Sequence, residues 1–369
     1  MVKNVIKSRG PYGPGEIMNV ASVGDNGEAL STGSFILTDS SFCEGRVKTL
    51  LVCGLSTPVE NRRRGNIRSM ISEMHELAAE EGAAVSLLHP FSFSYYRRFG
   101  YERVSDHLIA EFRTSDIDFV PQRCRFVPYE ESTLDDMIAV YDAFSRGRNL
   151  LLPRYDGSRY TGDGKRAYIY YEDGAPAAYV VVSGEKNLRV NNYTNTRLNV
   201  HELAYVSPAA LSEIFSFLRM FDGEYERIRI FDCSLCREVD MMLRHYTRTE
   251  YRTVADIAAR VINTEKLLSS ASYPEKEGSF TVRVTDGLKS ADGVFRVVYG
   301  GGDCKVSSVG DVCAADLTLT AGAFTQIVYG YRPVDQRSAA YMDGVCIHGD
   351  CDDFFCAFPC RPCGAFEHF

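Results

Sequence analysis

The chain has 369 residues, of which 45% are apolar and 24% are charged, an ordinary composition for a protein of two or three domains. Its net charge of −8 argues against a general binder of nucleic acid or of anionic membranes. The sequence contains no run of about 18 apolar residues, so it predicts no membrane-spanning helix.

The N-terminal segment MVKNVIKSRGPYGPGE lacks the apolar stretch of a signal peptide. We therefore expect a cytoplasmic protein whose twelve cysteines stay reduced. Two C-x-x-C pairs and a crowded C-terminal segment raise the possibility of a zinc or redox site, but the spacings fit no standard zinc motif, and free apolar thiols are the simpler reading. The residues concerned are Cys233, Cys236, Cys346, His348, Cys351, Cys356, Cys360 and Cys363.

The first elements are an antiparallel hairpin followed by a long strand. Residues 17–23 and 28–37 are predicted strands, because the turn between them contains Asn26-Gly27, the strongest short signal for a hairpin. Residues 46–57 form a further apolar strand, which Pro58 helps to end.

A helix follows this strand, since apolar residues recur at helical spacing from Asn66 and Gly82 stands where a helix usually ends. Residues 83–89 are a mostly apolar strand that is suited to burial on both faces. Residues 91–100 are a short aromatic helix, and residues 107–113 are predicted to close this first unit as a strand.

The second unit repeats the order of the first. Residues 167–182 are predicted to form a second hairpin, and residues 201–206 a strand that leads into a helix at residues 210–221. At this second joint between strand and helix stands Ser207-Pro208, without arginines or glycine. If the corresponding joint of the first unit binds an anion, we expect this one not to do so.

The third unit contains strands at residues 279–286, 294–300 and 315–320, followed by a helix at residues 323–331. The chain then ends in an aromatic segment that stays apolar up to Phe369. Because free ends are usually polar and frayed, we expect this tail to be docked on the protein.

Three arginines, Arg62 to Arg64, stand between the first long strand and its helix, directly before Gly65. The N-terminus of a helix carries unpaired N–H groups and partial positive charge, so it attracts phosphate. Gly65 allows close approach of the backbone, and Arg62 and Arg63 can add charge-assisted hydrogen bonds. The cluster is either a pyrophosphate site or a solvated run of charges, and the spacing by itself leaves both readings open.

The order of apolar strand, Thr57-Pro58, Arg-x-x-Gly and amphipathic helix resembles motif A of the GNAT acetyltransferases. Leu88-His89, followed by the segment from Tyr96 to Glu102 (YRRFGYE), is similar to the Y-x-[RK]-F-G-Y segment of the Eis (enhanced intracellular survival) branch. The degenerate second copy, the third domain and the ending CGAFEHF are also similar to that branch. The resemblance covers residues 17–369.

This resemblance implies a mixed α/β (α+β) fold of tandem GNAT domains, the second degenerate, followed by a sterol-carrier-like domain. We place the catalytic domain at residues 1–112, the degenerate domain at 113–255 and the sterol-carrier-like domain at 256–369. Members of the branch usually begin with a further strand and helices, whereas only residues 1–16 precede the first hairpin here. That difference puts the shape and activity of the amine pocket in question.

The resemblance also implies that acetyl-CoA binds along the end of the motif A strand and the start of its helix. The residues that it assigns to acetyl-CoA are the amides of Leu55 and Thr57 for the thioester, the amides of Arg63, Arg64 and Gly65 with the side chains of Arg62 and Arg63 for the pyrophosphate, and Arg68 one turn further on.

Tyr96 fits the general acid of the family, since a neutral phenol can protonate the departing thiolate; as one of three tyrosines within seven residues, it is otherwise a core aromatic. Phe99 and Tyr101 are assigned to the core. The family's base is the C-terminal carboxylate, here that of Phe369, which acts directly, through water, or by holding the ammonium. Rival bases are His368 and, less favoured, His89, whereas Glu367 is expected to help bind a cationic amine.

Together these features predict an acetyl-CoA-dependent N-acetyltransferase that acts on primary amines by direct transfer. The acceptor is an aminoglycoside-like polyamine, a small diamine or a lysine side chain, and we expect neither a bound metal nor a nucleic-acid or membrane partner. The family suggests a homo-oligomer, a trimer or a hexamer. The alternative function is a non-catalytic scaffold that binds acyl-CoA or lipid, and a zinc-binding tail is a third reading.

Overall fold

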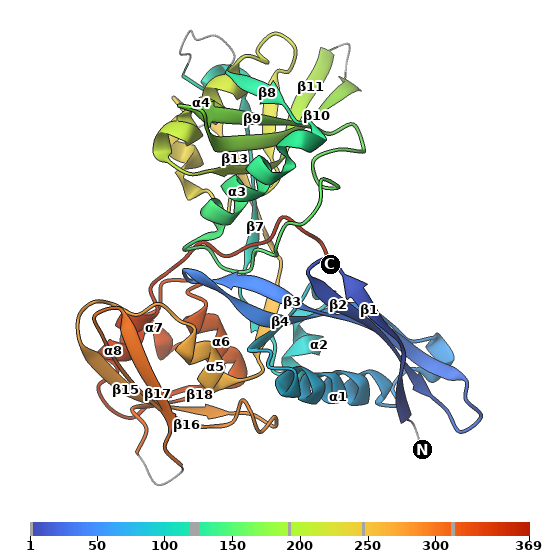
Figure 1. Cartoon of the computed structure of the whole chain (residues 1–369), viewed down its shortest axis with the longest axis vertical. Coiled ribbons are helices and arrows are strands. Elements are labelled where there is room, and N and C mark those ends of the chain that lie inside the picture. The colour runs from blue at the N-terminus through green and yellow to red at the C-terminus, as the bar shows by residue number, and fades with distance from the viewer. Residues whose placement is uncertain (1–2, 119–124, 191–192, 246–247, 311–313) are drawn as a thin grey trace. The chain divides into compact units, whose positions relative to one another are not determined.

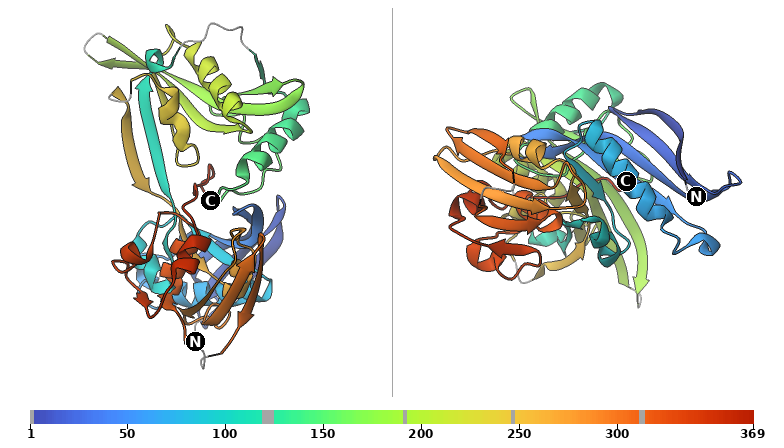
Figure 2. Two further views of the ribbon diagram at one scale, coloured as in Figure 1. Left: turned by 90° about the vertical axis from the view of Figure 1, so that its left-hand side faces the viewer. Right: turned by 90° about the horizontal axis from the view of Figure 1, so that it is seen from below.

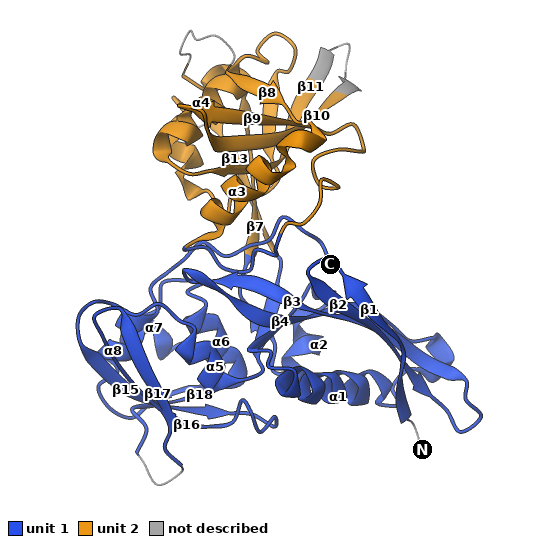
Figure 3. Ribbon diagram, viewed as in Figure 1, with its two compact units in different colours: residues 1–105, 147–153, 256–369 blue, residues 106–146, 154–255 orange. Residues whose placement is uncertain are grey.

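The structure is a computed structural model that describes residues 3–118, 125–190, 193–245, 248–310 and 314–369. The chain divides into two compact units, which Figure 3 shows in separate colours. Unit 1 comprises residues 1–105, 147–153 and 256–369, and unit 2 comprises residues 106–146 and 154–255.

Unit 1 contains a seven-stranded sheet of order β1-β2-β3-β4-β5-β14-β6, with helix α1 along one face (Figures 1 and 2). The elements are β1 (Lys3–Tyr12), β2 (Gly15–Val23), β3 (Ala29–Phe42), β4 (Gly45–Ser56), α1 (Asn66–Glu80), β5 (Val85–Leu88), α2 (Phe93–Tyr96), β6 (Glu102–Arg103) and β14 (Ala258–Val261). The predicted first hairpin, long strand, helix and aromatic helix are all confirmed.

Strand β1 was not predicted, and its surface explains why. It pairs with β2 at the edge of the sheet, and most of its side chains are exposed. An edge strand that buries little has no alternation of apolar and polar residues from which it could be recognised.

The point of the sheet that matters most for function is the end of β4. Strands β4 and β5 are parallel partners from Thr49 to Leu51, and β4 then continues to Ser56. The register of β4 with β3 shifts by one residue beyond Cys53, where Gly54 has a φ of 54°. Such a bulge re-aims the residues that follow it. Beyond Leu51 the end of β4 therefore separates from β5. We call the space between these two diverging strands the wedge.

Strand β14, which arrives from a distant part of the chain, lies between β5 and β6. All four of its residues are buried. The prediction that residues 107–113 close the first unit is wrong, because β7 (Asp106–Arg113) pairs with β12 (Arg227–Ile230) and β13 (Glu250–Ala255) in the sheet of unit 2. Residue patterns identify a strand, but they do not tell which sheet it joins.

Unit 2 is built on a second seven-stranded sheet, of order β13-β7-β12-β11-β10-β9-β8. The predicted hairpin and the predicted strand leading into a helix are both confirmed. The further elements are β8 (Phe126–Pro128), α3 (Leu134–Ser145), β9 (Arg166–Glu172), β10 (Ala175–Val190), β11 (Tyr193–Tyr205), α4 (Pro208–Arg219), β12 (Arg227–Ile230) and β13 (Glu250–Ala255).

The last part of the chain returns to unit 1 and forms a five-stranded sheet of order β17-β16-β15-β18-β19. No helix in the described part of the chain is long and apolar enough to cross a membrane. The elements are α5 (Thr264–Ser269), β15 (Gly278–Thr285), β16 (Gly293–Gly300), β17 (Asp303–Ser308), β18 (Leu317–Thr320), α6 (Ala321–Val328), α7 (Gln336–Ala339), β19 (Val345–Ile347) and α8 (Asp352–Ala357).

The two sheets of unit 1 share one hydrophobic core. Leu51 and Leu87 of the first sheet belong to the same buried cluster as Val282 and Phe324 of the C-terminal part. Phe369 packs against this cluster, so the tail is docked as predicted. The other face of the first sheet is covered by α1 through a separate core.

A buried polar network joins these layers around His75 of α1. Its Nε2 lies 2.8 Å from the hydroxyl of Tyr101, which also bonds to Ser86 at 2.6 Å. Arg260 of β14 lies 3.3 Å from Nδ1 of His75 and pairs with Asp286 at 2.5 Å. Burial and, secondarily, the charge of Arg260 hold the pKa of His75 well below its ordinary value.

This lowered pKa predicts a loss of stability in mild acid. The folded protein keeps His75 neutral, whereas the unfolded chain binds a proton below about pH 6.5, so the free energy of unfolding falls as the pH falls through that value. Between pH 7.5 and 5.5 we expect His75 to contribute a loss of about 1 kcal/mol. Urea denaturation of the wild type and of His75→Gln at both pH values measures it. Equal pH dependence in the two proteins would contradict a neutral buried His75.

Candidate active site

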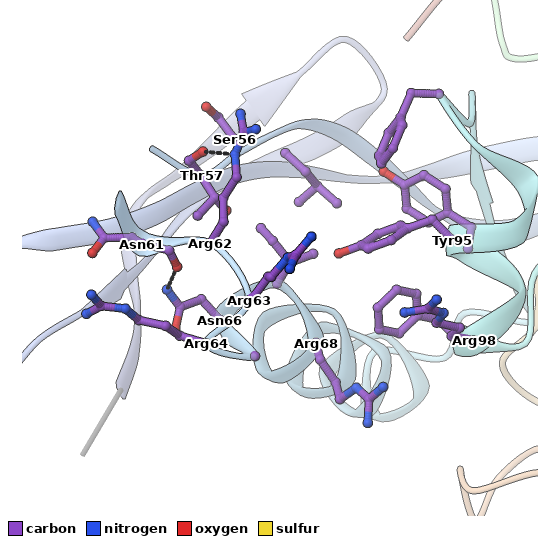
Figure 4. Close-up of a pocket in the computed structure, with 16 residues that line it drawn as sticks. Ser56, Thr57, Asn61, Arg62, Arg63, Arg64, Asn66, Arg68, Tyr95 and Arg98 are labelled. Atoms are coloured by element: carbon purple, nitrogen blue, oxygen red, sulfur yellow. Dashed lines mark hydrogen bonds between the residues drawn. The ribbon is translucent and has the colours of Figure 1, made fainter. Parts of the chain in front are cut away.

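A cleft of about 990 Å³ lies where β4 leaves β5 (Figure 4). It is lined by the end of β4, the start of α1 and the aromatic helix α2. Eight of the nine residues proposed from the sequence line it together: Leu55, Thr57, Arg62, Arg63, Arg64, Gly65, Arg68 and Tyr96. Their roles stay predictions, but the fold does bring them to one place.

The start of α1 is open to an anion. The helix begins after Gly65, whose φ of 83° places it in the left-handed region and which offers no side chain to the first N–H groups. Arg63 also has a positive φ, of 61°. In unit 2, by contrast, Ser207 accepts a hydrogen bond from the amide of Ala210, and Pro208 begins α4 without an N–H group. The second joint is thus capped by its own residues, and the first is not.

Five exposed arginines surround this helix start. Arg62 donates to the carbonyl oxygen of Thr57 at 3.2 Å, and Arg64 donates to that of Glu60 at 3.0 Å. In the described part of the chain none of the five has a carboxylate partner. The group consists of Arg62, Arg63, Arg64, Arg68 and Arg98.

The side chains of this arginine group differ in direction. Arg63 points toward the aromatic side of the cleft, whereas Arg64 points away from it (Figure 4). Arg98 stands opposite, beside Tyr95 (Figure 4). Sequence reasoning gave Arg98 no role, although it lies in the YRRFGY segment. Mutual repulsion of these charges is relieved when a polyanion binds, and a diphosphate fits both the charge and the open amides.

The aromatic side of the cleft holds a buried phenol. Tyr96 is only 6% exposed. The centroid of its ring lies 5.1 Å from that of Tyr95 and 5.5 Å from that of Phe91, and both pairs meet edge to face. Burial raises the pKa of Tyr96 to about 12, with a smaller contribution from Tyr95. At neutral pH this hydroxyl is therefore protonated and able to donate.

The two neighbouring aromatic residues that the sequence assigned to the core differ. Tyr101 is 1% exposed and belongs to the His75 network, so that prediction is confirmed. Phe99 lines the cleft and is only partly buried, so it is not simply a core residue. It sits in a single 3-10 turn, Arg97–Phe99, that ends at Gly100 and keeps its ring near the surface.

The cysteine on the strand faces away from the cleft. Cys53 is not among the lining residues, and it packs against the core that β4 shares with the C-terminal sheet. Burial raises the pKa of its thiol to about 11. A thiol held protonated on the far side of the strand is a poor nucleophile for chemistry in the cleft.

The chain end lies against the first sheet. The ring of Phe369 is 4.5 Å from the ring of His89, which follows directly after β5. The ring centroid of His368 lies 4.1 Å from that of the same imidazole. Phe369 does not line the cleft itself, so the placing of its carboxylate at the reacting group stays a prediction.

The cysteine-rich tail forms no cluster of ligands. Among the residues that the structure describes, no three His, Cys, Asp or Glu side chains are grouped so that they could hold a metal ion. Cys351 and Cys363 are buried, whereas Cys346, Cys356 and Cys360 are exposed.

Models of known families match three parts of the chain. A model of the acetyltransferase (GNAT) domain matches residues 9–104, and a second model of the same description matches residues 148–261. A model of the sterol carrier protein domain matches residues 264–341. No curated protein matches the sequence.

Solved structures share the fold over nearly the whole chain. A GCN5-related N-acetyltransferase from Anabaena variabilis has a TM-score of 0.81 at 16% identity, with 95% of this chain and 89% of that one covered. Eis1 from Mycobacterium abscessus has a TM-score of 0.77 at 14% identity, and the alignment covers 95% of this chain and 91% of that one. A probable N-acyltransferase from Enterococcus faecalis has the same TM-score at 16% identity, covering 96% and 89%.

The three matched regions follow one another in the order that the sequence predicted, and the full-length likeness includes an Eis protein. The chain therefore contains two acetyltransferase (GNAT) domains and a C-terminal sterol carrier protein domain, and it shares the fold of an Eis protein.

Proposed function

We propose that this protein is an acetyl-CoA-dependent N-acetyltransferase that transfers the acetyl group directly to a primary amine. The observation that carries the proposal is the cleft at the end of β4, which combines a helix start without a side-chain cap, arginines with no carboxylate partner among the described residues, and a buried phenol. Acetyl-CoA, when bound, supplies an acetyl group activated as a thioester. The protein's part is to hold its phosphates, polarise its carbonyl and protonate its sulfur.

The pyrophosphate fits the start of α1. The amides of Arg63, Arg64 and Gly65 belong to a turn with two positive φ angles, and no described side chain caps the helix start there. The guanidinium groups of Arg62 and Arg63 add charge-assisted hydrogen bonds. Arg68, one turn along the helix, lines the same cleft and extends the positive surface.

The thioester is assigned to the bulged end of β4. The amides of Leu55 and Thr57 follow the bulge at Gly54, and both residues line the cleft. Amides directed at the carbonyl oxygen stabilise the negative charge that develops when an amine attacks. Tyr96 then gives its hydroxyl proton to the departing sulfur. Its raised pKa keeps that proton available at neutral pH.

Transfer is direct because none of the cysteines in the described part of the chain lines the cleft. Cys53 is turned toward the core on the other face of the strand, and its pKa is raised to about 11. An acyl-enzyme would need an activated nucleophile with a base beside it.

The acceptor is assigned to the chain end. The carboxylate of Phe369 holds the amino group beside the end of β5, and Glu367 adds negative charge. The net charge of −8 favours a cationic acceptor of the same kind. The candidates are aminoglycoside-like polyamines, small diamines and lysine side chains. Assembly into trimers or hexamers stays a prediction.

The proposed role of Arg62 and Arg63 predicts that replacing them weakens the binding of CoA. Arg62→Glu and Arg63→Glu together should weaken the binding of CoA by roughly 100-fold or more, because hydrogen bonds to charged groups contribute about 1.5–3 kcal/mol each. Isothermal titration calorimetry measures the change. Arg64→Glu alters the charge in the same loop, but its side chain points away, so it should cost much less (Figure 4). Unchanged affinity in the double variant would remove the basis for a pyrophosphate at α1.

Tyr96→Phe should lower the turnover of acetyl-CoA by roughly 100-fold to 10 000-fold, the range for loss of a general acid. A thiol-release assay with acetyl-CoA and a panel of amines measures it. Tyr95→Phe removes a neighbouring hydroxyl from the same wall and should have a smaller effect. If the wild type binds CoA tightly and acetylates no amine in the panel, the protein is a scaffold that binds acyl-CoA and not this enzyme.

The position of the last carboxylate predicts sensitivity to one added residue. A glycine after Phe369 displaces the carboxylate by about 3.8 Å, so turnover should fall at least tenfold while CoA affinity stays the same. The matched variant Phe369→Leu keeps the carboxylate in place and should lose less. Full turnover by the extended protein would show that the terminal carboxylate has no part in the reaction.

A further inference from the structure

A buried arginine reaches the turn that follows Tyr96. Arg260 stands on β14, which pairs with β5 over residues 85–88, and it is only 6% exposed. Its Nη1 donates to the carbonyl oxygen of Phe99 at 2.6 Å. Phe99 ends the 3-10 turn Arg97–Phe99, and Tyr96 directly precedes that turn. One hydrogen bond therefore connects an inserted strand to the segment that bears the buried phenol of the cleft.

The guanidinium group of Arg260 is committed on its other sides as well. Nη1 also lies 3.3 Å from Nδ1 of His75, Nε donates to the carbonyl oxygen of Val261 at 3.2 Å, and Nη2 donates to Oδ1 of Asp286 at 2.5 Å. Arginine has five N–H groups in a planar fork, whereas lysine has three on a single flexible atom. These acceptors lie on different sides of the group, so the position is specific for arginine.

The turn lies directly on the buried ion pair of Arg260 and Asp286. Gly100 follows the turn with a φ of 80°, and a Cβ atom built there would lie 3.2 Å from Oδ2 of Asp286 and 3.4 Å from Cζ of Arg260. The carbonyl oxygen of Phe99 needs an outside donor, because the last carbonyl groups of a helical turn have no partner within it. The next residue, Tyr101, is fixed by the buried polar network of the fold. The segment is thus pinned at two nearby points.

The other contacts of Tyr96 are less able to fix its position. Some are with the apolar core beneath α1, and such packing is non-directional. The others are with aromatic rings of its own segment, which move with it: Phe91, Tyr95, Phe99 and Tyr101. A misplacement of about 1 Å can lower a rate roughly 100-fold. The hydrogen bond that ties the turn to the sheet is therefore able to govern the chemistry.

We propose that Arg260 is a positioning residue that holds Tyr96 at the thioester through the carbonyl group of Phe99. The assignment rests on the proposed N-acetyltransferase function, in which Tyr96 protonates the departing sulfur. Arg260 itself does not line the main cleft. It lies within residues 148–261, which match the second model of the acetyltransferase domain, but its strand belongs to the first sheet. The degenerate copy thus supplies a residue to the active site of the other copy.

The test replaces the ion pair without leaving a buried charge. Removing Arg260 alone would leave the carboxylate of Asp286 without its counter-charge, which is strongly destabilising for a buried pair. The test variant therefore combines Arg260→Met with Asp286→Asn, whose side-chain oxygen can still accept from the amide of Leu288. The matched control is Arg97→Gln, because Arg97 lies in the same turn but pairs with Glu102 through an exposed side chain.

We expect kcat of the double variant to fall roughly 10- to 100-fold with CoA affinity unchanged, because the acid is displaced while the coenzyme site is intact. In a Tyr96→Phe background the same substitutions should lower kcat less than about threefold, since the two effects then overlap. Arg260→Lys, which keeps the charge beside Asp286 and so protects folding, should show the same pattern with a smaller loss. Arg97→Gln should keep full turnover.

Two kinetic results would overturn the proposal. One is an unchanged kcat in the double variant. The other is a loss in the Tyr96→Phe background equal to that in the wild-type background, which would show a merely structural role for Arg260.

Hydrogen exchange measured by mass spectrometry gives a readout that needs no turnover. The amide of Gly100 donates to the carbonyl oxygen of Arg97 at 3.0 Å, and the amide of Tyr101 donates to that of Tyr96 at 3.4 Å. In the double variant these amides should exchange roughly tenfold faster, and in Arg97→Gln much less so. Equal exchange in the double variant and the wild type would also overturn the proposal. If the wild type acetylates no amine, the proposed function fails, and the exchange rates still decide whether Arg260 holds the turn.

Discussion

The separation of β4 from β5 is the constraint on which the rest of the site depends. Two parallel strands satisfy each other's backbone groups as long as they stay paired, and here the pairing stops at Leu51 while β4 continues to Ser56. The bulge at Gly54 makes this departure possible without a break in the strand. The cleft, the open start of α1 and the aromatic wall all border the wedge that results.

The wedge is held open from both sides of the sheet. On one face α1 packs its apolar residues against β3 and β4. On the other face the C-terminal sheet shares its core with the same strands, which gives the sterol carrier protein domain a structural role in unit 1. Strand β14 adds a third support, because it pairs with β5 and β6 and brings Arg260 into contact with His75. A GNAT domain cut at residue 105 would keep the packing of α1 but would lack the contacts with β14 and with the C-terminal sheet.

The two GNAT domains show how few residues decide whether the start of a helix has free N–H groups. Both have a strand, a turn and an amphipathic helix, but the residue before α1 is Gly65, whereas Ser207 precedes α4 and Pro208 is its first residue. The serine hydroxyl accepts a hydrogen bond from one N–H group at the helix start, and proline has no N–H group to offer. The second helix therefore has little left to offer a phosphate, whereas the first has open amides and five arginines. This difference was readable in the sequence because capping is a local interaction.

The sequence by itself determined the elements and the local chemistry of this protein: the hairpins, the amphipathic helices, the arginine cluster before Gly65 and the tyrosine of the YRRFGY segment. These follow from interactions between residues near in the chain. The tertiary structure alone decided that residues 106–113 join the second sheet, that β14 enters the first, and that Asp256 and Phe369 meet at His89. Such contacts join residues separated by more than 100 positions. They depend on which buried surfaces fit together, which no local pattern records.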